Sequence, residues 1–432
     1  MRFADARTPR WPGPIPGHNP LSGRTGHRRV AVIGAGAAGS MAAIFAAAGG
    51  ANVVLIETTR DGGRKILISG GGRCNVLPAR LNETRFSTDS SPNVLRKMLR
   101  SWPLSEQIAF FENDLRIPLV EESESAKLFP VSNKARDVRD ALLAQARAKG
   151  VELLMDSRVT GLAPSGQAWR IERDQGAPID VDAVVVATGG LSVPNTGSDG
   201  FGLTTLARLG HVVHPTYAAL TPLTANPAPF ASLAGVSLTV TLTARSDTRS
   251  ATATGGFLFT HHGYSGPSVL DVSHVAVRSR AEKGSSARIL VRWTALGEHE
   301  WKLAFTPHGA RTVAGAVRAE MPDRLATALL ERATVDPNRL LTELRRDERL
   351  RLIEALVRGE LPWTGDEGYK KAEVTGGGVS LAEIHPHTME SKRHPGLFLC
   401  GEVLDAFGPI GGYNFCWAWA TGRAAGIGSA RE

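Results

Sequence analysis

Apolar residues in the first third of the chain gather into short continuous runs, which is typical of strands buried on both faces of a parallel sheet. Residues 29–33 (RVAVI) form one such run, and the glycine-rich stretch GAGAAG (34–39) follows it directly. An Ala-rich stretch to about residue 48 then predicts a helix, and residues 53–56 predict a second strand that ends at Glu57. This order of strand, glycine turn, helix, strand and acid is typical of a dinucleotide-binding βαβ unit.

Each glycine of the GAGAAG turn has a separate expected role. Gly34 allows the tight turn, Gly36 lets backbone N–H groups approach a pyrophosphate, and Gly39 lets the helix pack close to the strand. The N-terminus of that helix directs about half a positive charge toward the pyrophosphate. Glu57 is placed to accept hydrogen bonds from the hydroxyls of a ribose.

Two later segments carry groups that also suit a phosphate-bearing cofactor. Residues 61–75 predict a glycine-rich loop with the cations Arg64, Lys65 and Arg73. Such cations, together with backbone N–H groups, suit phosphates or the anionic edge of a reduced flavin. A predicted strand ends at ATGG (187–190), where small residues let the backbone lie close to a cofactor.

The hydrophobic pattern changes about half-way along the chain and returns near its end. Alternating apolar and polar residues at 236–243 predict a half-exposed antiparallel strand, followed by further short strands. A helical period comes next, with Asp336-Pro337 predicted to start one helix and residues 346–358 forming another. Residues 396–402 repeat the buried strand and glycine turn, and Gly411-Gly412 predicts a final helix. We expect this last part to rejoin the first sheet.

Most of the net positive charge lies in the first residues of the chain. Of the eight net positive charges on 432 residues, five fall in residues 1–29, which hold six Arg and one Asp. The near-neutral remainder argues against a nucleic-acid partner. Residues 1–27 hold five prolines, four glycines and no apolar run, so we expect residues 1–28 to be a disordered tail rather than a secretory signal.

Composition also limits the cellular setting. No apolar stretch is long enough to span a bilayer, so we expect no membrane association. Three cysteines without a C-x-x-C pair predict neither a disulfide framework nor a metal site. We therefore expect a cytoplasmic protein with a small-molecule substrate, and the sequence leaves its oligomeric state open.

Several longer motifs are shared with one known family. They are GRK (63–65), SGGGRCN (69–75), FPVS (129–132), SGP (265–267), GGVSL (377–381), GEVLD (401–405), GP (408–409), GGYN (411–414) and WAW (417–419). With them the chain resembles the BaiN/YhiN-like NAD(P)/FAD-dependent oxidoreductases, which are related to fumarate reductase flavoproteins. The resemblance covers nearly all of residues 29–427.

The resemblance implies an α/β fold in which a Rossmann-type FAD-binding domain is split in sequence. An inserted antiparallel β subdomain and a small helical subdomain would separate the two parts. We expect the first part of the FAD-binding domain at residues 29–215 and the second part at 370–432. The β subdomain is expected at 216–306 and the helical subdomain at 307–369.

The same resemblance implies one bound FAD. The glycine turn would hold its ADP half, and the helix that begins at Gly412 would point its positive end at the flavin. The residues expected to contact FAD are Gly34, Ala35, Gly36, Ala38, Gly39, Glu57, Thr58, Arg64, Lys65, Arg73, Cys74, Asn75, Val159, Thr188, Gly189, Gly190, Gly401, Glu402, Gly412, Tyr413 and Asn414.

The resemblance further implies reduction of an activated, enone-like C=C bond of a small apolar substrate by hydride transfer from flavin N5. NADH or NADPH is the expected electron donor, although no second G-x-G-x-x-G marks a separate domain for it. No catalytic residue is identified, and His261, His262, Tyr264 and Tyr413 are candidates for the proton donor. At 262 and 264 the family has arginine and leucine, so substrate preference is expected to differ.

Three other functions remain open from the sequence. The first is a small-amine oxidase or dehydrogenase on the same scaffold. The second is an FAD-dependent RNA-modifying enzyme, against which the near-neutral body argues. The third is a flavin-binding regulator without enzymatic activity, since no distinctive acid/base set is present.

Overall fold

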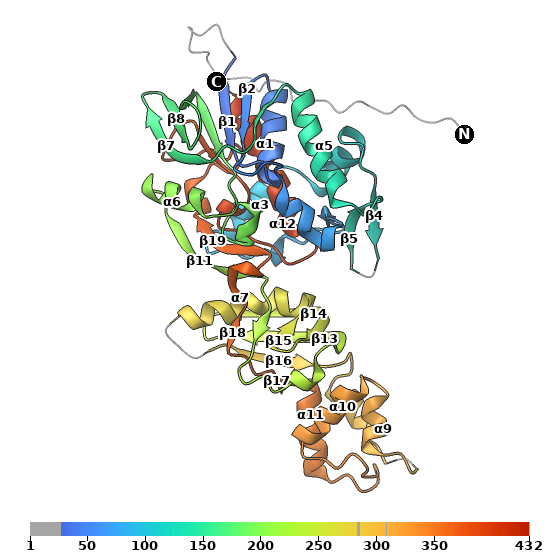
Figure 1. The fold of residues 1–432 in the computed structure, drawn as a ribbon. Helices are drawn as coiled ribbons and strands as arrows, with labels where there is room; N and C mark the ends of the chain where they lie inside the picture. The colour runs from blue at the N-terminus through green and yellow to red at the C-terminus, as the bar shows by residue number, and fades with distance from the viewer. Residues whose placement is uncertain (1–26, 124, 283–285, 308, 432) are drawn as a thin grey trace, which may run out of the picture.

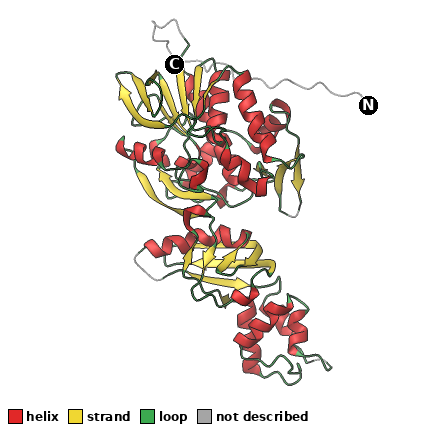
Figure 2. Ribbon diagram, viewed as in Figure 1, coloured by secondary structure: helices red, strands yellow, loops and turns green. Residues whose placement is uncertain are grey.

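The structure is a computed structural model that describes residues 27–431 except 124, 283–285 and 308. Most of the predicted tail therefore lies outside the described residues. The molecule is elongated, with a larger α/β part at one end, an antiparallel sheet in the middle and a group of helices at the other end (Figures 1 and 2).

A five-stranded parallel sheet forms the centre of the larger part (Figure 1). Its strands lie in the order β20-β10-β1-β2-β6 and are β1 (Arg29–Ile33), β2 (Asn52–Ile56), β6 (Glu152–Leu154), β10 (Ala183–Val186) and β20 (Leu397–Leu399). All of β10 and β20 is buried, as expected for strands covered on both faces. β20 pairs with β10 in parallel from Val184↔Leu397 to Val186↔Leu399, so the end of the chain rejoins the first sheet as predicted.

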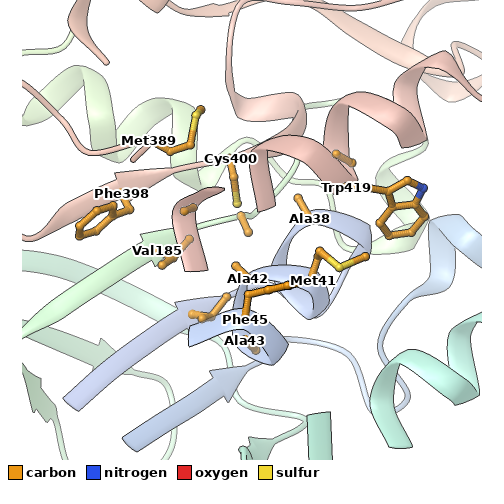
Figure 3. Close-up of a cluster of buried hydrophobic side chains, with 14 of the residues drawn as sticks. Ala38, Met41, Ala42, Ala43, Phe45, Val185, Met389, Phe398, Cys400 and Trp419 are labelled. Carbon is orange, nitrogen blue, oxygen red and sulfur yellow. The ribbon is translucent and has the colours of Figure 1, made fainter. Parts of the chain in front are cut away.

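Two helices from opposite ends of the chain pack against each other on this sheet. They are α1 (Ala37–Ala48) and α12 (Tyr413–Ala430). Their backbones approach closely at Gly422 and Gly426, where an added Cβ would lie 2.4 and 2.3 Å from carbonyl oxygens of α1. Figure 3 shows α1 side chains in the core near Cys400 and Trp419, both fully buried.

Shorter elements surround the parallel sheet. The strands are β3 (Leu77–Pro78), β4 (Leu119–Glu122), β5 (Lys127–Pro130), β7 (Val159–Ser165), β8 (Ala168–Arg173) and β9 (Ile179–Val181). The helices are α2 (Arg64–Ile68), α3 (Pro92–Leu99), α4 (Leu104–Ala109), α5 (Ala135–Ala148) and α6 (Phe201–Arg208). An antiparallel pair, β11 (Val213–Ala219) with β19 (Val374–Val379), lies where the chain leaves for the insertion and returns from it.

The insertion is built on a seven-stranded antiparallel sheet in the order β17-β16-β13-β14-β15-β12-β18. Its strands are β12 (Leu223–Thr224), β13 (Ser237–Arg245), β14 (Ser250–Phe259), β15 (Gly263–Ser265), β16 (Arg288–Arg292), β17 (Gly359–Glu360) and β18 (Gly365–Asp366). The helix α7 (Pro267–Ala281) packs on β13 and β14 and also contacts β11 of the larger part.

Four helices complete the insertion: α8 (Glu298–Ala304), α9 (Val313–Arg318), α10 (Asp323–Arg332) and α11 (Arg346–Val357). They share one hydrophobic core with the antiparallel sheet, in which Trp293 and Trp301 are both buried. Because the core is shared, the division of the chain at residues 215, 306 and 369 stays a proposal.

The predicted fold class is confirmed, and the local differences have identifiable causes. The predicted loop at 61–75 contains α2, because Ile66 is buried between two glycine-rich stretches. The helix α7 lies where only strands and turns were expected. No helix begins at Asp336-Pro337, since α10 ends at Arg332 and α11 begins at Arg346.

Candidate cofactor and active site

One cavity of about 540 Å³ opens at the carboxyl ends of the parallel strands. Four strands each deliver a turn to its wall: Gly34 and Gly36 follow β1, Glu57 follows β2, Thr188-Gly189 follows β10, and Gly401-Glu402 follows β20. This edge of a doubly wound sheet is where such folds bind ligands. The volume is in the range of cofactor pockets.

In the β1–α1 turn, the space beside the backbone is open at Gly36, whereas other backbone atoms fill it at Gly34 and Gly39. A Cβ on Gly34, whose φ is 103°, would lie 2.5 Å from the Ala187 carbonyl oxygen, and one on Gly39 would lie 1.8 Å from the Gly34 carbonyl oxygen. A Cβ on Gly36 would meet nothing within 4 Å, and Gly36 lines the cavity. The space over Gly36, at the N-terminus of α1, therefore suits a phosphate.

Glu57 is held rigidly at the end of β2. Its carboxylate accepts a hydrogen bond of 2.7 Å from the Ala35 N–H and bonds of 2.8 and 2.7 Å from the Thr59 N–H and hydroxyl. The residue is 9% exposed and faces the cavity. A fixed carboxylate at this position suits the hydroxyls of a ribose.

A polar network ties four segments of the chain together at the cavity wall. The Lys65 ammonium donates to Glu402 Oε2 at 2.5 Å and to the Ser192 hydroxyl, which in turn donates to Glu402 Oε1 at 2.6 Å. The Thr375 N–H donates to the same Oε1 at 2.9 Å. Burial opposes ionisation of Glu402, but the Lys65 charge and these donors together lower its pKa. The wall therefore carries an ionised carboxylate with its counter-charge in place.

The other end of the cavity lies at the start of α12. Gly411 and Gly412 line it with Phe407 and Ile410, and Gly412 has φ of 89°. The Asn414 side chain accepts a 2.9 Å bond from the Gly408 N–H and donates one of 2.9 Å to the Gly408 carbonyl, which fixes this loop. The positive end of α12 therefore faces the cavity, where it suits the flavin C2=O.

Acidic and basic side chains meet at this same end. Lys127 from β5 packs on Gly411, because a Cβ added to Gly411 would lie 3.3 Å from Lys127 Cε, and Glu373, just before β19, also lines the cavity. Asp271 of α7 accepts a 2.8 Å bond from the Ile410 N–H. Burial raises the pKa of Asp271 to about 6 and also raises that of Glu373.

One polar atom in the wall lacks a partner among the described residues. The Thr188 hydroxyl oxygen is buried and makes no hydrogen bond, although the residue lines the cavity. The hydroxyl is turned away from the cavity, because a Cβ added to Gly202 would lie 2.1 Å from its oxygen. The open backbone at Gly36, the carboxylate at Glu57 and the N-terminus of α12 are therefore the groups that fit FAD.

The structure brings most of the predicted cofactor residues together. Those that line the cavity are Gly34, Gly36, Ala38, Glu57, Thr58, Arg64, Lys65, Asn75, Val159, Thr188, Gly189, Gly401, Glu402, Gly412 and Asn414. The others support it from behind or lie beside it: Ala35, Gly39, Arg73, Cys74, Gly190 and Tyr413. Arg73 pairs with Glu122 at 2.9 Å, and burial raises the pKa of Cys74 to about 12, which leaves its thiol unreactive.

The proton-donor candidates lie away from the cavity lining. His261 and His262 are exposed in the turn between β14 and β15. Tyr264 is 1% exposed in the core of the insertion, and its hydroxyl donates to the Pro362 carbonyl at 2.8 Å. The Tyr413 hydroxyl donates to the Arg80 carbonyl at 3.3 Å.

Sequence reasoning missed several cavity residues. Lys127 lies just before the FPVS motif, and Glu373 directly precedes the glycine-rich strand β19. No local pattern marks either residue as functional. Phe407 and Ile410 lie between two recognised motifs, GEVLD and GGYN. Proximity to a shared motif was therefore the signal that could have found them.

Metal-ligating clusters and membrane-spanning helices are both absent from the described part of the chain. No group of three or more His, Cys, Asp or Glu side chains there is placed to hold a metal ion. No helix there has both the length and the apolar character needed to cross a membrane.

Comparison with known proteins gives matches along nearly the whole chain. The HI0933-like protein Rossmann domain family matches residues 28–428. The 3-dehydro-bile acid delta(4,6)-reductase of Clostridium scindens is 32% identical over 412 residues, which cover 94% of this chain and 99% of the relative. The ribosomal RNA dihydrouridine synthase of Escherichia coli is 31% identical over 404 residues (91% of this chain, 96% of the relative). That of Haemophilus influenzae is 30% identical over 414 residues (93% and 98%).

Solved structures with a similar arrangement are more distant in sequence. The 3-ketosteroid-delta4-(5alpha)-dehydrogenase from Rhodococcus jostii RHA1 is 16% identical, with a TM-score of 0.47 over 95% of this chain and 98% of that one. A flavocytochrome c3 fumarate reductase is 17% identical, with a TM-score of 0.46 over 94% of this chain and 79% of that one.

Proposed function

We propose, from the premise that this chain belongs to the HI0933-like Rossmann family of flavoprotein oxidoreductases, that it reduces a C=C bond conjugated to a carbonyl. The observation that carries this proposal is the single cavity between two βα turns. The N-termini of α1 and α12 both face that cavity, although they lie about 370 residues apart in the chain. Such a cavity suits one elongated dinucleotide better than two separate ligands.

The residues that would hold FAD follow from the cavity wall. Glu57 would bind the ribose, and the open backbone at Gly36 would bind the pyrophosphate. The start of α12 would face the flavin ring. Bound FAD, once reduced by a donor such as NADH or NADPH, supplies the hydride of the reaction.

The choice of reaction rests on what the relatives' names have in common. One name describes reduction of a delta(4,6) 3-dehydro-bile acid, and the other describes formation of dihydrouridine. In both, the bond to be saturated is conjugated to a carbonyl, since the uracil C5=C6 bond is conjugated to C4=O. The shared chemistry favours conjugated C=C reduction over amine oxidation.

Two substrate classes are consistent with the proposed reaction. A small apolar enone is favoured by the apolar side chains of Phe407 and Ile410 at the flavin end. A uridine in RNA is favoured by Lys127, Lys370 and Lys371, which line the cavity and form no ion pair with any described residue. The expectation of no nucleic-acid partner therefore stays open, and the experiment below includes both substrates.

The test is anaerobic stopped-flow spectroscopy of purified, FAD-loaded protein. NADH, NADPH and benzylamine are each mixed with the oxidised protein, and the reduced protein is then mixed with 2-cyclohexenone, a 3-oxo-Δ4 steroid or a uridine-containing RNA oligonucleotide. Reduction of the protein by benzylamine would favour amine oxidation instead. Reoxidation by a steroid or an RNA, with a saturated product, supports the proposal and selects the class. A protein that binds no FAD, or that reacts with none of these substrates, refutes it and favours a regulatory role.

A further inference from the structure

The flavin end of the cavity holds a carboxyl group that the proposed function does not yet use. Glu373 lines the cavity just before β19, and its side chain has no hydrogen-bond or ion-pair partner in the described part of the chain. Its backbone is fixed, because its N–H donates to the Leu220 carbonyl at 3.1 Å. A rigid backbone with an uncommitted carboxyl is the arrangement expected of a group that acts on a ligand.

The charged groups around Glu373 come from three other elements. They are Lys127 on β5, Lys65 on α2 and Asp271 on α7. The carboxyl is accessible from the cavity, but protein surrounds it on its other sides, and this burial raises its pKa. The negative charge of Asp271 raises the pKa further, whereas the positive charges of Lys127 and Lys65 lower it. The net shift is upward, so a larger fraction of Glu373 keeps its proton near neutral pH than of an ordinary glutamate.

A reduction of the proposed kind needs one hydride and one proton. Hydride addition to the β-carbon leaves negative charge shared between the α-carbon and the carbonyl oxygen of the substrate. The α-carbon must then receive a proton, and a group with a pKa near the working pH is suited to give it. Of the candidates identified from the sequence, His261, His262, Tyr264 and Tyr413, none lines the cavity.

Resting on the proposed function, we propose that Glu373 donates the proton to the α-carbon of the substrate. The carboxylic acid loses its proton as the new C–H bond forms, and the resulting carboxylate regains a proton from water. The ammonium of Lys127 lies at the same end of the cavity, where its charge favours the negative carbonyl oxygen. The hydride, which carries both electrons, would come from the reduced cofactor, so one hydride and one proton saturate the bond and the step balances.

The first test compares Glu373→Gln with wild type in the two half-reactions. We expect FAD affinity and reduction by NADH, NADPH or dithionite to change less than about threefold, whereas reoxidation by the enone or RNA substrate slows by at least about 100-fold. Reoxidation of wild type should slow as pH rises through the pKa of Glu373, and that of the variant should not depend on pH. Glu367→Gln is the matched control, because Glu367 is exposed six residues away and lies outside the cavity lining.

The second test does not need activity. A raised folded-state pKa adds stability below the unfolded value near 4.5, and this stability is lost as pH rises through the folded value. The melting temperature of cofactor-free wild type should therefore fall relative to Glu373→Gln as pH rises above 4.5. Glu367→Gln should follow wild type.

The outcomes separate this inference from the proposed function. If wild type and Glu373→Gln are reoxidised at the same rate, Glu373 is not the donor, although the function stands. If their melting temperatures depend on pH in the same way, the carboxyl lacks the shifted pKa and the assignment also fails. If no probe reoxidises wild type, the proposed function is refuted and the assignment with it.

Discussion

The contact between α1 and α12 predicts different consequences for two glycines that stand one helical turn apart. A Cβ on Gly422 would lie 2.4 Å from the carbonyl oxygen of Ala38, which lines the cavity. A Cβ on Gly426 would lie 2.3 Å from the carbonyl oxygen of Ala42, one turn further from the cavity. We therefore expect Gly422→Ala to affect both stability and FAD binding, and Gly426→Ala to affect mainly stability.

The expected magnitude follows from two opposing effects. Ordinary contacts begin near 3.4 Å, so either alanine must separate the helices by about 1 Å. Replacing glycine by alanine in a helix gains about 0.8–1 kcal/mol on its own. Overpacking costs about 1–3 kcal/mol, and the upper part of this range applies because the opposing atoms belong to a rigid backbone. The net change is a loss of about 1–2 kcal/mol of unfolding free energy for each variant.

FAD affinity distinguishes the two substitutions. A movement of about 1 Å at Ala38 displaces the N-terminus of α1 from the phosphate site, so Gly422→Ala should weaken FAD binding by about tenfold or more, which corresponds to about 1.4 kcal/mol. Gly426→Ala should change the affinity less than threefold. The double variant should lose less stability than the sum of the two losses, because helices already separated accept the second Cβ more easily.

Urea unfolding of cofactor-free protein and titration with FAD measure these effects. Gly315→Ala in α9 is the control, since a Cβ there meets only the Thr312 hydroxyl at 3.2 Å, and it should be neutral or stabilising. If Gly426→Ala is as stable as wild type, the helices do not approach as closely as described. If both variants bind FAD equally well, the link between this contact and the cavity is wrong.

Three other predictions concern charged groups. Glu57→Gln should raise the FAD dissociation constant by about 10–100-fold in calorimetric titration, since hydrogen bonds to a charged group contribute about 1.5–3 kcal/mol. An unchanged affinity would show that Glu57 does not bind the ribose. Lys65→Met leaves the Glu402 carboxylate without its counter-charge and should lower the unfolding free energy in urea by about 2–3 kcal/mol. The double variant with Glu402→Gln should recover more than half of that lost stability, and no recovery would contradict the pairing. Because the pKa of Asp271 is raised from 3.8 to about 6, the stability that it adds should be lost as pH rises from about 3.8 through about 6. Asp271→Asn should flatten this fall in the melting temperature, and an equally steep fall in the variant would contradict the shift.

The strands of the parallel sheet were predictable because burial on both faces leaves a continuous apolar run. β1 has the predicted bounds, and β2 begins one residue earlier than predicted. A surface helix that buries one face was predictable from the helical spacing of its apolar residues, as α11 shows with its predicted start at Arg346. In each case one local pattern is sufficient to specify the structure.

The helix α7 shows where local pattern is insufficient. Its sequence is rich in β-branched valine, which favours strands, and it follows an alternating strand pattern. The buried residues Val269, Val272 and Val275 recur every three positions, which fits a helix, but the polar residues between them made that period weak. Packing on β13 and β14 decides the outcome, and the sequence of α7 alone does not contain that information.

One end of the cavity could be predicted from local sequence patterns and the other could not, and this difference bears on function. The end proposed for the ADP half is made by turns that follow neighbouring strands of the parallel sheet. Parallel strands bring their carboxyl ends to one edge, so these residues could be predicted from the strand and turn pattern of the chain. The flavin end combines β5, α7, the segment before β19 and the start of α12, and only tertiary packing brings Lys127, Asp271 and Glu373 together. Substitutions at the flavin end can therefore change the substrate without disturbing the cofactor turns. This separation gives a physical reason for one FAD scaffold to accept substrates as different as an enone and a uracil ring.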